Sequence, residues 1–171
     1  MQKITLIGFA LAVALIVPTD ACRAQARQQN PGPATQQPAP PPGRRDLSNA
    51  SAFAGRYRCI WTSPDGFVYE CELQLRNTSA TEVDGRIQWT LIRSPRPGEQ
   101  AKLGMSGAEL VRGALDGPGK VNISGYDKVD PNGILGLDEY KLELSGTARW
   151  IFGTTSNHGD WNAQFYAVRL Q

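Results

Sequence analysis

The sequence predicts an all-β domain, a single antiparallel up-and-down barrel of eight strands, with a two-sheet β-sandwich as the alternative. From about Ala52 to Gln171, short apolar alternations are separated by Gly, Pro, Asp and Asn, a pattern typical of many short strands joined by turns. No stretch of this region keeps an apolar period of 3.6 residues over three turns, as an amphipathic helix would. The predicted strands follow one another through mostly short connections, which favours pairing between consecutive strands.

The alternation predicts strands in eight places. They are 55–62, 67–76, 85–93, 108–116, 119–126, 134–144, 147–154 and 161–170. In the sixth of them the apolar phase changes parity between Leu137 and Tyr140. A β-bulge near Asp138-Glu139 would produce such a change, and bulges are common at barrel rims.

The first two strands form the hairpin whose register is best determined. A loop Pro64-Asp65-Gly66 would place Gly66 at the left-handed position of a type I turn followed by a bulge. The register implied by this loop pairs Ser63 with Phe67, Trp61 with Tyr69, Cys59 with Cys71 and Tyr57 with Leu73, and it sets Arg58 opposite Glu72 on the other face. Because directly opposed strand positions lie within bridging distance, we expect Cys59 and Cys71 to form a disulfide that faces the core.

The N-terminal residues are typical of a processing signal followed by a linker. One early positive charge precedes an apolar run from Ile4 to Val17 that is too short to span a bilayer. Ala24-Gln25-Ala26 then matches the small-x-small pattern at which signal peptidases cleave. We therefore expect a signal peptide over 1–26, a disordered Pro/Gln-rich linker over 27–46 and the barrel domain over 47–171.

Export to the periplasm or the medium follows from this organisation, and a lipid anchor at Cys22 is the alternative. The residues before Cys22 match a lipoprotein signal only in part, because Thr19 stands where such signals usually have Leu. Neither route leaves a transmembrane span.

Composition excludes several classes of function. The net charge of +2 provides no basic excess of the kind that dominates nucleic-acid binding. One histidine cannot build a multi-histidine metal site, and three cysteines cannot build a four-thiolate zinc site. We expect no resident cofactor.

Two further segments carry candidate sites. Residues 128–139 approach the spacing of a calcium loop, with Asp130, Asn132 and Glu139 as weak candidate ligands. Lys128 occupies the position where a carboxylate is expected, so a tight turn without metal is the preferred interpretation. Residues 94–102 form the longest connection in the domain, either an exposed recognition loop or a long turn.

Short motifs resemble the calycin-type β-barrels, the avidins and lipocalins. Gly55-Arg56-Tyr57 is similar to the Gly-x-Trp that opens their first strand, and 150–155 followed by Trp161 resembles the last two avidin strands. In avidins the corresponding tryptophans line a biotin pocket, which this resemblance would transfer to Trp150 and Trp161 only. Residues 109–113, 134–138 and 161–163 also resemble bacterial exported domains of unassigned function. The resemblance implies a barrel and does not imply biotin.

The sequence favours an exported, non-catalytic binding protein. We expect a small apolar or planar ligand in the barrel mouth, lined by Trp61, Trp89, Trp150 and Trp161. A module that binds or inhibits another protein through exposed loops is the alternative. A hydrolase of unrecognised type, using Asp130, Glu139 or His158, is the least favoured hypothesis.

Overall fold

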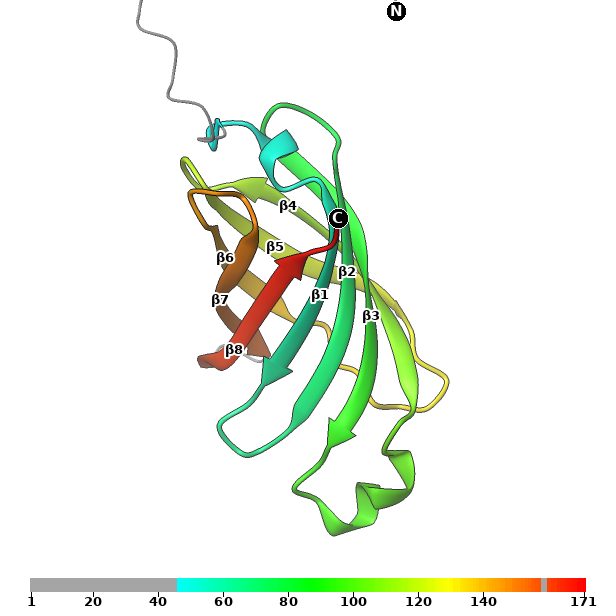
Figure 1. Ribbon diagram of the computed structural model, residues 1–171. Helices are drawn as coiled ribbons and strands as arrows, with labels where there is room; N and C mark the ends of the chain where they lie inside the picture. Colours follow the sequence, from blue (N-terminus) through cyan, green and yellow to red (C-terminus); the bar gives the residue numbers. More distant parts are fainter. Residues whose placement is uncertain (1–45, 158–159) are drawn as a thin grey trace, which may run out of the picture. The chain divides into compact units, whose positions relative to one another are not determined.

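The computed structural model describes residues 46–157 and 160–171, which form one closed antiparallel barrel (Figure 1). Each strand pairs with the next in sequence, and β8 closes the barrel against β1. The predicted up-and-down barrel is therefore confirmed. The predicted signal peptide, Cys22, all of the predicted linker except Asp46, and His158 lie outside the described residues.

Eight strands and two short 3₁₀ helices make up the domain. The elements are η1 (Ala50–Ala52), β1 (Gly55–Thr62), β2 (Val68–Asn77), β3 (Glu82–Arg93), η2 (Pro97–Lys102), β4 (Ser106–Leu115), β5 (Lys120–Val129), β6 (Glu139–Leu144), β7 (Trp150–Asn157) and β8 (Asp160–Arg169). No helix in the described part of the chain is long and apolar enough to cross a membrane.

The interior is filled by side chains that alternate along every strand with outward-facing ones, as the pleat requires. Burying these apolar groups is the main force that closes the sheet. Each strand contributes at least one side chain of this kind: Tyr57, Leu73, Ile87, Val111, Val121, Leu142, Ile151 and Phe165 in order from β1 to β8.

The first hairpin has the predicted register. Cys59 pairs with Cys71 and Trp61 with Tyr69, and Gly66 has a positive φ of 101° in the turn. Cys59 and Cys71 form the predicted disulfide, with their Cα atoms 4.8 Å apart. By the chain-entropy estimate such a short loop contributes about 3 kcal/mol to the free energy of unfolding.

The sixth strand is shorter than the sequence predicts. β6 begins at Glu139, and 130–138 is a loop that joins it to β5. The loop still attaches to the barrel, because the Gly125 amide donates to the Asp138 carbonyl at 2.8 Å. The change of apolar parity near Asp138 therefore marks the start of the strand, and the predicted bulge within a longer strand is wrong.

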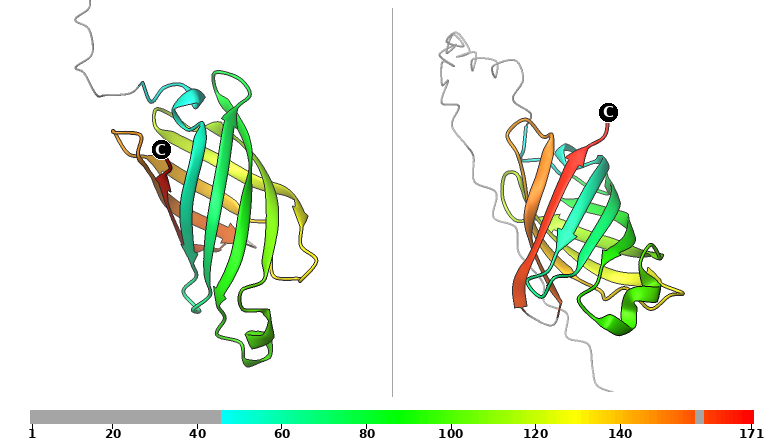
Figure 2. Two further views of the ribbon diagram at one scale, coloured as in Figure 1. Left: turned by 45° about the vertical axis from the view of Figure 1, so that its right-hand side comes forward. Right: turned by 60° about the horizontal axis from the view of Figure 1, so that its bottom comes forward.

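One end of the barrel is closed by η1 and the C-terminal end of β8 (Figures 1 and 2). Phe53 is fully buried there, and its carbonyl accepts a 2.8 Å hydrogen bond from the Tyr57 hydroxyl. The Arg169 guanidinium lies over the Tyr57 ring, 4.7 Å from its centroid. A Cβ at Gly55 would overlap this guanidinium, so a larger residue at this position would displace Arg169.

Arg169 ties three chain segments together at this closed end. Its guanidinium donates to the carbonyls of Ala52 and Ala54 at 2.5 Å each and to that of Ala148 at 2.8 Å. These carbonyls belong to η1, the residues just before β1, and the β6–β7 turn. One charged side chain therefore satisfies backbone acceptors that the strands leave without partners.

Candidate functional site

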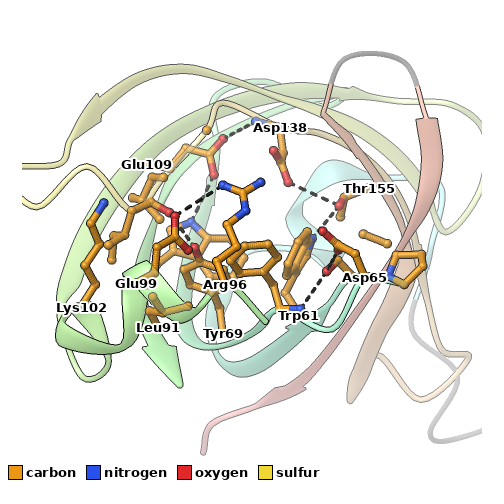
Figure 3. Close-up of a pocket in the computed structure, with 18 of the residues that line it drawn as sticks. Trp61, Asp65, Tyr69, Leu91, Arg96, Glu99, Lys102, Glu109, Asp138 and Thr155 are labelled. Carbon is orange, nitrogen blue, oxygen red and sulfur yellow. Dashed lines mark hydrogen bonds and ion pairs between the residues drawn. The ribbon is translucent and has the colours of Figure 1, made fainter. Parts of the chain in front are cut away.

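The opposite end of the barrel contains a cavity of about 530 Å³, within the range of small-molecule sites. Its walls come from the β1–β2 turn, η2, the 130–138 loop and the adjoining strand ends (Figure 3). The lining side chains include the aromatic residues Trp61, Phe67, Tyr69, Trp89 and Tyr140. The barrel is therefore sealed at one end and hollow at the other.

A continuous series of aromatic rings runs from this cavity into the core. The ring centroids of Trp61 and Tyr69 are 5.6 Å apart, and those of Tyr69 and Trp89 are 6.0 Å apart. Trp89 packs on Phe165 at 6.3 Å, and Phe165 packs on Tyr140 at 5.8 Å. All four contacts are edge-to-face, the favoured geometry for aromatic pairs, so the rings hold one another in fixed orientations.

Glu109 of β4 is a buried acid in the cavity wall, and its residue surface is only 2% exposed. One carboxyl oxygen, Oε2, accepts hydrogen bonds from the Tyr140 hydroxyl at 2.5 Å and from Trp89 Nε1 at 3.2 Å. The other oxygen, Oε1, accepts from the Asp138 amide at 3.0 Å. Three elements of the barrel thus fix this carboxyl group in place.

The acid fits because its carboxyl group lies against a glycine of the neighbouring strand, Gly125, which pairs with Val111. A Cβ at Gly125 of β5 would overlap the Glu109 carboxyl group. Burial raises the pKa of Glu109 to about 7, although the hydrogen bonds from Tyr140, Asp138 and Trp89 oppose that shift. Burial and the Glu109 charge also raise the pKa of Tyr140 well above 10, so Tyr140 remains a neutral donor.

Two hydrogen-bonded contacts attach the 130–138 loop to the aromatic wall. The Tyr69 hydroxyl donates to the Ile134 carbonyl at 2.6 Å. Trp61 Nε1 donates to Thr155 Oγ1 at 2.6 Å, and that hydroxyl donates to Asp138 Oδ2 at 3.4 Å. Burial, followed by the charges of nearby carboxylates, raises the pKa of Tyr69 to about 12, so this contact persists across the neutral range.

The 94–102 connection forms the charged rim of the cavity. Arg96 lies 3.4 Å from the Glu99 carboxylate, which also accepts from the Ser94 hydroxyl at 2.8 Å. The Arg96 guanidinium lies 5.1 Å from the Phe67 ring centroid, and Lys102 Nζ donates to a carbonyl of the 130–138 loop at 3.0 Å. This connection therefore contributes to the cavity wall.

The four predicted tryptophans lie in different places. Trp61 and Trp89 line the cavity. Trp150 is 51% exposed, next to the inward-facing Ile151, and Trp161 packs against Lys141 Nζ, 4.0 Å from its ring centroid. Neither Trp150 nor Trp161 is among the lining residues, so the structure brings together two of the four.

The weak calcium candidate occupies a turn. The Asp130 carboxylate accepts from the amides of Ile134 and Leu135 at 3.0 and 2.8 Å, and the Asn132 side chain donates to a β4 carbonyl at 3.1 Å. Glu139 is an exposed residue of β6. Over residues 46–157 and 160–171, no group of three or more His, Cys, Asp and Glu side chains could hold a metal ion.

Comparison with known proteins identifies the fold alone. No protein family and no curated protein matches the sequence. A de novo designed fluorescence-activating β-barrel is similar in structure, with a TM-score of 0.51 and 10% identity over 71% of this chain and 98% of the design. A redesigned barrel called mFAP1, bound to DFHBI, has a TM-score of 0.53 and 10% identity over 71% and 99% of the two chains. These designs share the eight-stranded barrel with this protein.

Proposed function

We propose that this protein is an exported, non-catalytic binding protein that holds a small, planar, mainly apolar ligand in the open end of its barrel. The observation that carries the proposal is the cavity of about 530 Å³ with an ordered aromatic wall. An eight-stranded barrel can either fill its interior or leave room for one small ligand. Here the core packs beneath the cavity and leaves that room at one end.

Two other observations support parts of the proposal. Similar barrels are described as fluorescence-activating or as bound to DFHBI, so this architecture is compatible with a small ligand in a designed protein. The Cys59–Cys71 disulfide is of a kind that persists mainly in oxidising compartments, which agrees with the export that the N-terminal residues predict.

The cavity can be tested with a neutral planar probe, 2-naphthalenemethanol, titrated into the purified protein in a calorimeter. We expect saturable binding of one molecule, weakened about tenfold or more by Trp61→Ala, because truncation removes one ring of the aromatic wall. Trp150→Ala is the matched control, since this variant loses the same side chain from the outer surface and should bind the probe as the unmodified protein does.

Native mass spectrometry of the purified protein provides an independent test. A co-purifying mass that disappears on denaturation would support the proposal and indicate the class of ligand. A bare protein that also fails to bind the naphthalene probe would contradict it, and would favour a module that binds another protein through its exposed loops.

A further inference from the structure

The Glu109 carboxyl group is bound by hydrogen-bond donors that carry no charge, and Lys128, which pairs with Glu109 on β5, directs its Nζ to Asp130 instead. The partners of the Glu109 carboxyl group are a phenol, an indole and a backbone amide. Among the described residues no Lys or Arg forms an ion pair with it. A carboxylate buried without a counter-charge is costly, so its ionised form at the wall of a cavity favours a positive charge in that cavity.

The other charges around the cavity have the same bias. The described lining contains four acids, Asp65, Glu99, Glu109 and Asp138, and two bases, Arg96 and Lys102. Both bases belong to the rim and already have partners, a carboxylate for Arg96 and a loop carbonyl for Lys102. The lining therefore has more acids than bases, although the chain as a whole has a net charge of +2.

The Glu109 carboxylate has acceptor capacity left for a ligand. Two carboxylate oxygens offer about four lone-pair positions. Tyr140 and Trp89 donate to Oε2, whereas Oε1 accepts only the Asp138 amide among the hydrogen bonds described. Oε1 packs against Gly125, and by this count one of its acceptor positions has no partner among the hydrogen bonds described.

Building on the proposed function, we propose that the ligand is a cationic aromatic amine whose protonated nitrogen donates to Glu109 while its ring packs on Trp61, Tyr69 and Trp89. The aromatic faces favour the cation as well, through the attraction between a positive charge and a π-system. A neutral molecule of the same shape lacks the attraction between opposite charges, and an anionic one is repelled by the carboxylate.

Binding of a cation must then be coupled to ionisation of Glu109. The groups that contact its carboxyl group are Tyr140 from β6, Asp138 from the 130–138 loop and the non-titrating Trp89 from β3, and Gly125 of β5 has no side chain there. Lys128 of β5 pairs with Glu109 along the strands, but its Nζ lies 3.7 Å from the Asp130 carboxylate and donates to the Leu135 carbonyl. Tyr140 remains neutral, and the Asp138 charge raises the pKa of Glu109 further. Glu109, with a pKa of about 7, is therefore the group whose proton the bound cation displaces.

The decisive experiment uses three probes with one ring system and different charges: 2-naphthalenemethylamine, 2-naphthalenemethanol and 2-naphthoate. Calorimetry on the purified protein at pH 8 should give a Kd for the amine about tenfold or more below that of the alcohol, and the weakest binding for the carboxylate. Amine affinity should fall by up to about tenfold per pH unit below pH 7, with proton release visible in buffers of different ionisation enthalpy.

Two variants separate Glu109 from general charge effects. Glu109→Gln should abolish both the amine preference and its pH dependence while the alcohol still binds. Glu70→Gln removes one negative charge from an exposed position of β2 outside the cavity lining and should change amine affinity less than about threefold. Alcohol or naphthoate binding as tightly as the amine would overturn the inference and leave the proposed function standing. Failure of all three probes to bind would contradict both.

Discussion

Each end of the barrel contains one ionisable side chain with three hydrogen-bond partners, and the two side chains, Arg169 and Glu109, differ in what they contact. At the closed end Arg169 donates to three backbone carbonyls and lies on the Tyr57 ring. At the open end the Glu109 carboxyl group accepts from three donors and borders the cavity. The Glu109 carboxyl group, with a pKa of about 7, changes its charge in the neutral range.

The two ends therefore contribute differently to the stability of the barrel and to ligand binding. Arg169 connects segments from the beginning and the end of the barrel domain, so its contribution goes into holding the barrel closed. Glu109 lines the cavity, and among the described residues no Lys or Arg forms an ion pair with it. Changes at the first end should therefore affect unfolding alone, whereas changes at the second should affect both unfolding and binding and alter their dependence on pH.

The largest expected effect is at the closed end. Arg169→Ala leaves the carbonyls of Ala52, Ala54 and Ala148 without their charged donor, and we expect it to lower the free energy of unfolding by about 4 kcal/mol. Arg58→Ala, at an exposed position of β1, should lower it by less than about 1 kcal/mol. Urea denaturation at one pH measures both, and equal losses would refute a special role for Arg169.

Glu109 should affect stability in a way that depends on pH. Its folded-state pKa of about 7 lies above the ordinary value of 4.5, so the folded state binds the proton more tightly than the unfolded state does. This stabilisation is fully present below about pH 4.5 and is lost as the pH rises through 7, a change on the order of 3 kcal/mol. Glu109→Gln cannot titrate and should lack this change.

Urea denaturation of the ligand-free protein and of Glu109→Gln at pH 5 and pH 8 tests this prediction. The difference in unfolding free energy between the two proteins should shift in favour of the variant at the higher pH. Parallel pH profiles would show that Glu109 ionises in the folded protein as readily as it does in the unfolded chain.

A smaller effect should come from the glycine that makes room for the acid. Gly125→Ala places a methyl group on the Glu109 carboxyl group, and we expect it to cost about 2 kcal/mol of stability and to weaken amine binding. Gly98→Ala is the matched control, because nothing lies within 4 Å of a Cβ at Gly98. Thermal unfolding and calorimetry distinguish the pair, and similar values for both variants would contradict the close contact at Gly125.

Most of the barrel could be predicted because its signals are local. In the first hairpin the turn at Gly66, the apolar alternation and the cysteine pair all specified one register, and the structure has that register. The apolar residues from Ile134 to Leu137 predict a strand where the structure has a loop. In that loop Ile134 and Leu135 line the cavity, and Leu137 is exposed.

The candidate site was predictable only in part, because the cavity is assembled from residues distant in sequence. Trp61 and Trp89 were found by their size, but size alone could not separate them from Trp150, which lies in an apolar run whose inward residue is Ile151. Glu109 was missed because a charge between apolar neighbours indicates the solvent side of a strand. Gly125 leaves the room that the carboxyl group occupies, but the sequence alone does not show that this glycine lies beside Glu109.

The pairing of β1 with β8 has a consequence for how the chain reaches this structure. The closing contacts, such as Cys59 opposite Ala167, join the beginning and the end of the domain, and contacts so distant in sequence form slowly because a long loop must first be closed. Until β8 has been synthesised, β1 has an unpaired edge of the kind that recruits other chains. We therefore expect closure of the barrel to be a late step in folding, and a shortened chain lacking β8 to be prone to aggregate.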